Sequence, residues 1–161
     1  MSERPAAAPA RSRVVRRLLV AIAVALVAAL AYQAVGAAVF GPRLGSDDPA
    51  EVVTAYFDAQ RWGYRGIAES VLSDDERELR SAPNYVRPII PDELFARDLV
   101  VEGPSDIPLR GEFAEEVQFR VAYQSMWRSE VGEPPGRRYW FVYLGRDEGE
   151  PWQLLGQGTG P

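Results

Sequence analysis

The sequence predicts an α+β protein that begins with one transmembrane helix. Three observations support this class. The run from Leu18 to Phe40 contains no charged residue. Apolar residues between 48 and 80 recur every three or four positions, as on one face of a helix, whereas from 99 onward they alternate every second position, as in strands. Because the helical patterns come first and the strand patterns follow, a segregated α+β domain is predicted.

The apolar run is long enough to cross a bilayer. A helix rises about 1.5 Å per residue, so its 23 residues span the roughly 30 Å hydrocarbon core. Residues 1–17 carry five arginines against one glutamate, which favours a cytoplasmic N-terminus. We therefore expect a basic cytoplasmic tail at 1–17, a span at 18–40 in contact with the lipid bilayer, and a single-pass protein of the cell membrane. The C-terminal domain would lie outside the cytoplasm.

A cleaved signal peptide is the alternative interpretation of this segment. Small residues would allow cleavage after Ala31 or Ala37. The apolar core of a signal peptide usually has only about 7–15 residues, so the length favours a retained anchor. Both interpretations export the domain.

Charge and composition exclude several function classes. From Arg43 onward the chain has 13 arginines and 22 acidic residues, a net charge of −9. This charge disfavours nucleic acid as a partner. We also expect anionic lipid to repel the domain from the membrane surface. The chain has neither His nor Cys, so the commonest metal ligand, the commonest general base and thiolate chemistry are missing. We expect no cofactor and no metal.

A short linker is expected at 41–47, followed by a domain over 48–161. Asp48 can accept hydrogen bonds from free backbone amides, Pro49 suits a first helical turn, and Glu51 completes a capping box, so a helix is predicted to start here. Gly63 is expected to end it.

Two more helices and an extended loop follow. Apolar spacing over 64–72 predicts a second helix directly after the first. Ser73 and the acids behind it form another capping signature, which predicts a short third helix to Arg80. These acids lack the spacing of a calcium loop and suit the electropositive helix end. The prolines within 82–91 predict an extended loop.

The C-terminal half predicts an antiparallel meander. Strands are expected at 99–102, 117–124, 138–144 and 152–155, with a hairpin loop at 130–136. In the second of these, the residues expected on the buried face are Val117, Phe119, Val121 and Tyr123. In the third, aromatic residues occupy both faces. The apolar area of the face with Trp140 and Val142 is expected to be larger than the helices can cover. The uncovered part would then be a surface for binding a partner.

Two stretches resemble a known fold family. DDPAEVVTAYFDAQRWGYRGIAESVLSDD resembles the opening helices of small bacterial domains with the nuclear-transport-factor-2-like (cystatin-like) cone fold. VQFRVAYQSMW and RRYWFVYLGRDEGEPWQLLGQGTGP resemble their closing strands. The resemblance covers most of 48–161 and implies three helices packed in the concavity of a strongly curved antiparallel sheet. Some members are steroid isomerases or polyketide cyclases, and others are docking modules of envelope transport or conjugation complexes.

The resemblance also implies a pocket inside the cone. The polar and aromatic candidates for it are Tyr56, Asp58, Arg120, Tyr123 and Tyr139. In the alternative, purely structural interpretation, Tyr56 and Tyr123 are core aromatics. Asp58 and Arg120 then lie on solvated faces, because charged residues are mostly exposed. No catalytic residue is assigned.

We therefore expect a membrane-tethered extracytoplasmic binding or scaffolding domain without catalytic activity, acting with a cell-envelope protein partner. The alternatives are an isomerase- or cyclase-like enzyme and a hydrophobic-ligand carrier. The enzyme requires a closed apolar pocket with a carboxylate of raised pKa and a Tyr within hydrogen-bond reach.

Overall fold

The computed structural model describes residues 10–85, 91–105, 111–128 and 134–158, with side chains from Val14 onward. It divides into two compact units, Met1–Val35 and Gly36–Pro161. Part of the expected basic tail, residues 1–9, lies outside the described residues.

Helix α1 (Ala10–Leu44) runs through the first unit and ends in the second. The described side chains from Val14 to Val35 are all exposed. Among the described residues, α1 is the one helix long and apolar enough to cross a membrane, which is compatible with a single-pass protein. The helix continues through the first half of the 41–47 segment that was expected to be a linker, because Leu44 is buried in the second unit.

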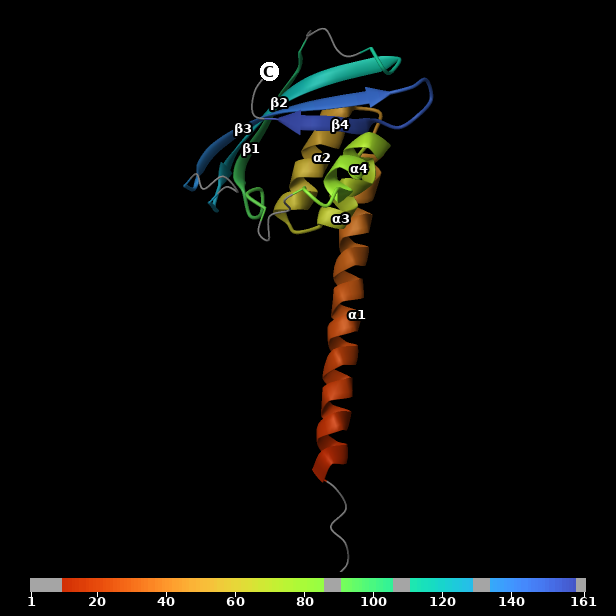
Figure 1. The fold of residues 1–161 in the computed structure, drawn as a ribbon, viewed down its shortest axis with the longest axis vertical. Helices are drawn as coiled ribbons and strands as arrows, with labels where there is room; N and C mark the ends of the chain where they lie inside the picture. The colour runs from red at the N-terminus through yellow and green to blue at the C-terminus, as the bar shows by residue number, and fades with distance from the viewer. Residues whose placement is uncertain (1–9, 86–90, 106–110, 129–133, 159–161) are drawn as a thin grey trace, which may run out of the picture. The chain divides into compact units, whose positions relative to one another are not determined.

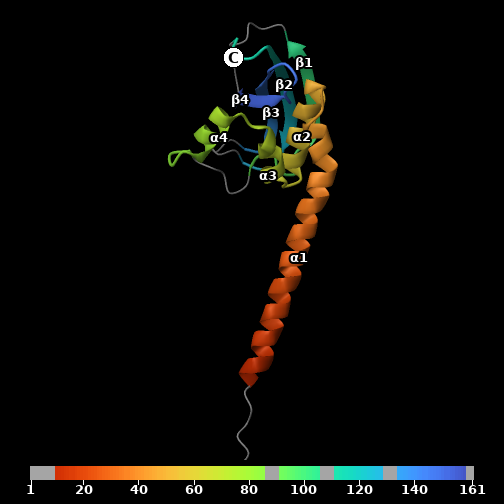
Figure 2. The ribbon, with the colours of Figure 1, turned by 90° about the vertical axis from the view of Figure 1, so that its right-hand side faces the viewer.

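The second unit confirms the α+β class. It contains α2 (Pro49–Arg61), α3 (Arg65–Ala68), a 3-10 turn η1 (Glu69–Val71) and α4 (Asp74–Ser81). Four strands follow: β1 (Arg97–Ser105), β2 (Glu115–Ser125), β3 (Gly136–Arg146) and β4 (Gln153–Gly158). They form one antiparallel sheet in the order β1-β2-β3-β4. Helices α2, α3 and α4 lie on one face of the sheet, with α2 toward β1 and β2 and α4 toward β4 (Figures 1 and 2).

Local capping chemistry sets the helix starts. Asp48 Oδ1 accepts from the amide of Ala50 at 2.9 Å, as the sequence predicts. Glu51 does not reach back to the cap itself. Instead, the Ser46 hydroxyl donates to Glu51 Oε2 at 2.7 Å and accepts from the Asp48 amide at 3.2 Å. Ser46 therefore links Asp48 and Glu51, the two residues of the expected capping box. At α4, Ser73 Oγ accepts from the amide three residues later at 3.3 Å.

The sheet register decides which strand face enters the core. Antiparallel pairing places Phe119 opposite Val142 and Val121 opposite Trp140, so the two β3 residues point toward the helices. The outer face carries Tyr139, which is 45% exposed. The surface suggested for Trp140 and Val142 is therefore the covered face: Val142 is fully buried and Trp140 half-buried.

The last turns of α1 belong to the core of the second unit. Phe40 and Leu44 are buried, and the Phe40 and Tyr64 rings lie 5.5 Å apart between centroids. Gly36 permits this approach. A Cβ at position 36 would overlap the Tyr64 ring and lie 2.8 Å from Ile67 Cδ1. Glycine is required here by close packing, not by an unusual backbone angle.

We predict opposite effects for alanine at two helical glycines. Gly66→Ala in α3 meets open space and gains helix propensity, so it should raise the free energy of unfolding by up to about 1 kcal/mol. Gly36→Ala must displace Tyr64 and Ile67, so it should lower that free energy by about 1–3 kcal/mol. Guanidinium titration of the full chain in detergent, followed by Trp fluorescence, measures both. Equal effects of the two substitutions would show that α1 does not pack as described.

Candidate functional site

A cleft of about 520 Å³ opens between α4 and the β4 side of the sheet. Helix α4 lines it with Asp75, Glu76 and Leu79, and the strands line it with Tyr143 and residues 155–158. Its surface is more apolar than polar, and Leu79 is 58% exposed on its rim.

The cleft begins where α4 and β4 cease to be joined. The Ser73 amide donates to the Leu154 carbonyl at 2.9 Å, and Leu72 forms a parallel bridge with the same residue. Beyond this point β4 bulges, because the register passes from the Leu144–Leu154 pair to the Tyr143–Gly156 pair. Gly156 lines the cleft, and a Cβ added there would meet nothing within 4 Å.

A buried polar network holds two of the cleft residues in place. Arg80, only 5% exposed, donates from Nε to Glu76 Oε1 at 2.7 Å and from Nη1 to the Tyr56 hydroxyl at 3.1 Å. Tyr56 in turn donates to Gln157 Oε1 at 3.4 Å. Burial raises the pKa of Tyr56 to about 12, so its phenol stays protonated and can donate. Glu76 and Gln157 thus face the cleft from fixed positions.

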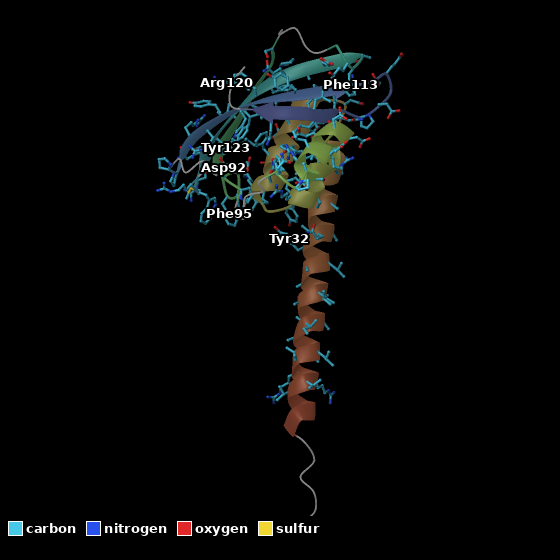
Figure 3. All side chains as sticks on the ribbon, in the orientation of Figure 1. Tyr32, Asp92, Phe95, Phe113, Arg120 and Tyr123 are labelled. Atoms are coloured by element: carbon cyan, nitrogen blue, oxygen red, sulfur yellow. The ribbon has the colours of Figure 1, made fainter. Side chains whose placement is uncertain are left out.

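A second polar cluster lies between the helices and the other end of the sheet (Figure 3). Trp140 Nε1 donates to the Tyr123 hydroxyl at 2.8 Å, and that hydroxyl donates to Asp92 Oδ1 at 3.3 Å. Arg138 lies 3.4 Å from the other Asp92 oxygen. The neighbouring Glu93 is buried, and its pKa is raised to about 8, mainly because burial disfavours the carboxylate and secondly because of the Asp92 charge.

Glu93 and Tyr123 are the groups that proton-transfer chemistry would require, and both are buried. Tyr123, Phe57 and Phe119 are at most 2% exposed. Neither the α4–β4 cleft nor a second cleft of about 370 Å³ beside Leu44 and Trp152 is lined by Glu93 or Tyr123.

The structure does not bring the five predicted pocket residues together. Tyr56 and Tyr123 are buried between the helices and the sheet. Arg120 and Tyr139 lie on the outer face, where the guanidinium carbon sits 4.7 Å from the ring centroid. Asp58 lies on α2, 3.2 Å from a guanidinium of the α1 end. The physical reason is the two-residue period of strands, which places positions 120 and 123 on opposite faces.

Sequence reasoning did not single out Arg80, Gln157 or Glu93. The pair of Glu76 and Arg80 carries a local signal, because side chains four apart on a helix are neighbours. Gln157 meets Tyr56 across 101 residues of chain, a contact that no local pattern indicates.

Comparison with known protein families, with curated proteins and with solved structures found no match to this chain. Within the described ranges, no group of three or more Asp, Glu, His or Cys residues is placed to hold a metal ion.

Removal of Arg80 is predicted to destabilise the fold far more than removal of an exposed arginine. Arg80→Ala leaves the Glu76 carboxylate, 11% exposed, without its partner and should lower the free energy of unfolding by about 3–5 kcal/mol. Arg120→Ala breaks a pair whose side chains are 47% and 56% exposed and should change it by less than about 1 kcal/mol. Denaturant titration of both variants measures the contrast, and similar losses would rule out a special role for the buried network.

Glu93→Gln is predicted to change how stability depends on pH. The Glu93 pKa rises from about 4.5 to about 8 on folding, so the native state binds this proton more tightly and wild-type stability falls as pH rises from about 4.5 to 8. Glutamine removes the ionisation, so the variant should match wild type near pH 5 and exceed it near pH 8 by on the order of 3 kcal/mol. Unfolding titrations at several pH values test this, with exposed Glu150→Gln as control. Parallel curves for wild type and Glu93→Gln would contradict it.

Proposed function

We propose that this protein is a membrane-tethered binding module. Helix α1 spans the bilayer with the N-terminus in the cytoplasm. The second unit lies outside, folds as a nuclear-transport-factor-2-like cone, and holds an extended segment of an envelope protein in the cleft between α4 and β4. The observation that carries the binding role is the contrast between the two edges of the sheet.

The β1 edge carries the features that prevent pairing with other chains. Its register shifts twice, Pro104 lies within it, and charged Arg97 and Glu102 stand along it. The β4 edge also has one register shift, between Leu154 and Gly156, but it lacks the other two features. Residues 153–158 are uncharged and contain no proline, and the described backbone partners on the side of β4 away from β3 stop at Leu154. An edge left open beside a cleft favours the addition of a strand.

The cleft residues indicate the chemistry of the bound segment. Leu79, Tyr143 and Leu155 offer apolar contacts to alternate side chains of an extended chain. Asp75 adds an exposed carboxylate at the rim, which suits a Lys or Arg on the partner. We therefore expect a short extended segment that combines apolar side chains with a basic one.

Separate observations support the proposed cone fold and the proposed membrane tether. Helices followed by an antiparallel meander, with the helices on one sheet face, suit the proposed cone. The arginines before the apolar run suit the proposed orientation. A tether of this kind would raise the local concentration of the module near a partner in the same envelope.

Glu93 favours a second candidate, an isomerase- or cyclase-like enzyme. Its raised pKa beside Tyr123 fits an acid that exchanges protons with a substrate. That function also requires substrate-sized space next to Glu93, which neither described cleft provides. Turnover of a small molecule that depends on Glu93 would displace the binding proposal.

Photo-crosslinking in the source cell tests the binding role. A photoreactive phenylalanine analogue at Leu79 on the cleft rim should give one defined protein adduct, whereas the analogue at Val100, 39% exposed on the outer sheet face, should not. Gly156→Val adds a side chain to the cleft lining, where a Cβ meets nothing within 4 Å, and should reduce the Leu79 adduct by about tenfold or more.

Matched controls separate the cleft from general damage. Gly136→Val places the same side chain on β3 with ordinary contacts of 3.8 Å and should keep the adduct. Asp75→Asn should weaken it, whereas Asp74→Asn in the same helical turn, outside this cleft, should not. An adduct that forms equally at both analogue positions, or that survives Gly156→Val, would refute binding in the cleft.

A further inference from the structure

The length of the apolar run brings the second unit to the membrane surface. This step rests on the proposed span. Arg17 is the last charge before the run, and about 20 helical residues cross the hydrocarbon core. Counted from Leu18, those residues end at Ala37, one position after the second unit begins at Gly36. Tilt would require still more residues and would bring the folded unit closer.

Packing identifies which end of the unit meets the bilayer. The position of a Gly36 Cβ is occupied by the Tyr64 ring, so the loop after α2 lies beside the residue where the span enters the fold. Trp62 is two residues from Tyr64, and consecutive Cα atoms are about 3.8 Å apart, so the two Cα atoms lie within about 7.6 Å. Ile67 Cδ1 contacts the same glycine site.

Two large apolar side chains are exposed at this end. Trp62 is 51% exposed and Phe95 is 54% exposed. They lie close together, because the Phe95 amide donates to the Arg61 carbonyl at 2.8 Å. Phe95 also has a backbone φ of 58°, which is rare for a bulky residue and costs conformational energy. Figure 3 shows Phe95 at the end of the folded unit that carries α3.

We propose that Trp62 and Phe95 form an interfacial pair that inserts into the headgroup layer of the bilayer that α1 crosses. Aromatic residues concentrate at this layer because their rings are apolar while the surroundings remain wet. The nearby guanidiniums of Arg61 and Arg65 already pair with acids of their own helices at 3.5 and 2.9 Å. The pair therefore binds through its aromatic surface and does not depend on anionic lipid.

Single-cysteine labelling of the full chain in phosphatidylcholine vesicles tests the pair, since the chain has no native cysteine. An environment-sensitive fluorophore is attached at Gly66→Cys, where open space surrounds the glycine beside the pair, and at Glu148→Cys, an exposed turn between β3 and β4. Lipids spin-labelled near the headgroup should quench the Gly66→Cys label about twofold or more beyond the Glu148→Cys label. Trp62→Ser with Phe95→Ser should remove that excess.

A third label separates this proposal from the proposed tether. The label at Val27→Cys, in the middle of the apolar run, should be quenched by lipids spin-labelled deep in the acyl chains. Quenching at Val27→Cys with equal quenching at Gly66→Cys and Glu148→Cys would overturn the interfacial pair and leave the tether standing. Excess quenching at Gly66→Cys that persists in the double serine variant would overturn the role of the two aromatics. Absence of deep quenching at Val27→Cys would overturn both.

Discussion

The contact between Gly36 and the Tyr64 ring is the constraint on which the rest of the second unit depends. Only a residue without a side chain lets the end of α1 approach the loop after α2 this closely. That approach places Phe40 and Leu44 in the same core as α2 and the sheet. The last turns of α1, from Gly36 onward, therefore belong to the folded unit, and the apolar run and the folded core share residues.

The same core contains polar groups that are costly to bury, and its interior is organised around them. Arg80 is satisfied by Glu76 and Tyr56, and Tyr123 by Trp140 and Asp92. Removing one partner from such a network leaves the other buried without a hydrogen bond, which costs free energy. This cost favours the one arrangement in which the polar groups are paired. The consequence for function is preorganisation. Residues that face the α4–β4 cleft are held by the interior, so a bound segment would not have to order them first.

The features that the sequence predicts well are those decided by neighbouring residues. Asp48 and Ser73 cap helices as expected because capping acts over three residues, and Phe119 and Val121 are buried because strand alternation is local. The end of α1 was missed because it depends on Tyr64, twenty or more residues away along the chain. The pocket hypothesis for Arg120 conflicts with the strand period, which places Arg120 and Tyr123 on different faces of the sheet, as the alternative interpretation expected. Strand β1 is longer than predicted because pairing with β2 recruits residues without a strand pattern of their own.

Net charge and the aromatic pair lead to one orientation of the proposed tethered unit. The charge of −9 from Arg43 onward repels anionic lipid, but in physiological salt this repulsion decays over about 8 Å. The proposed contact of Trp62 and Phe95 with the headgroups is short-ranged and lies at the end of the second unit that contains Gly36. Repulsion would therefore hold the rest of the acidic surface away, while the covalent connection would keep this end at the headgroups. The α4–β4 cleft, built from other residues, would remain available to the proposed partner.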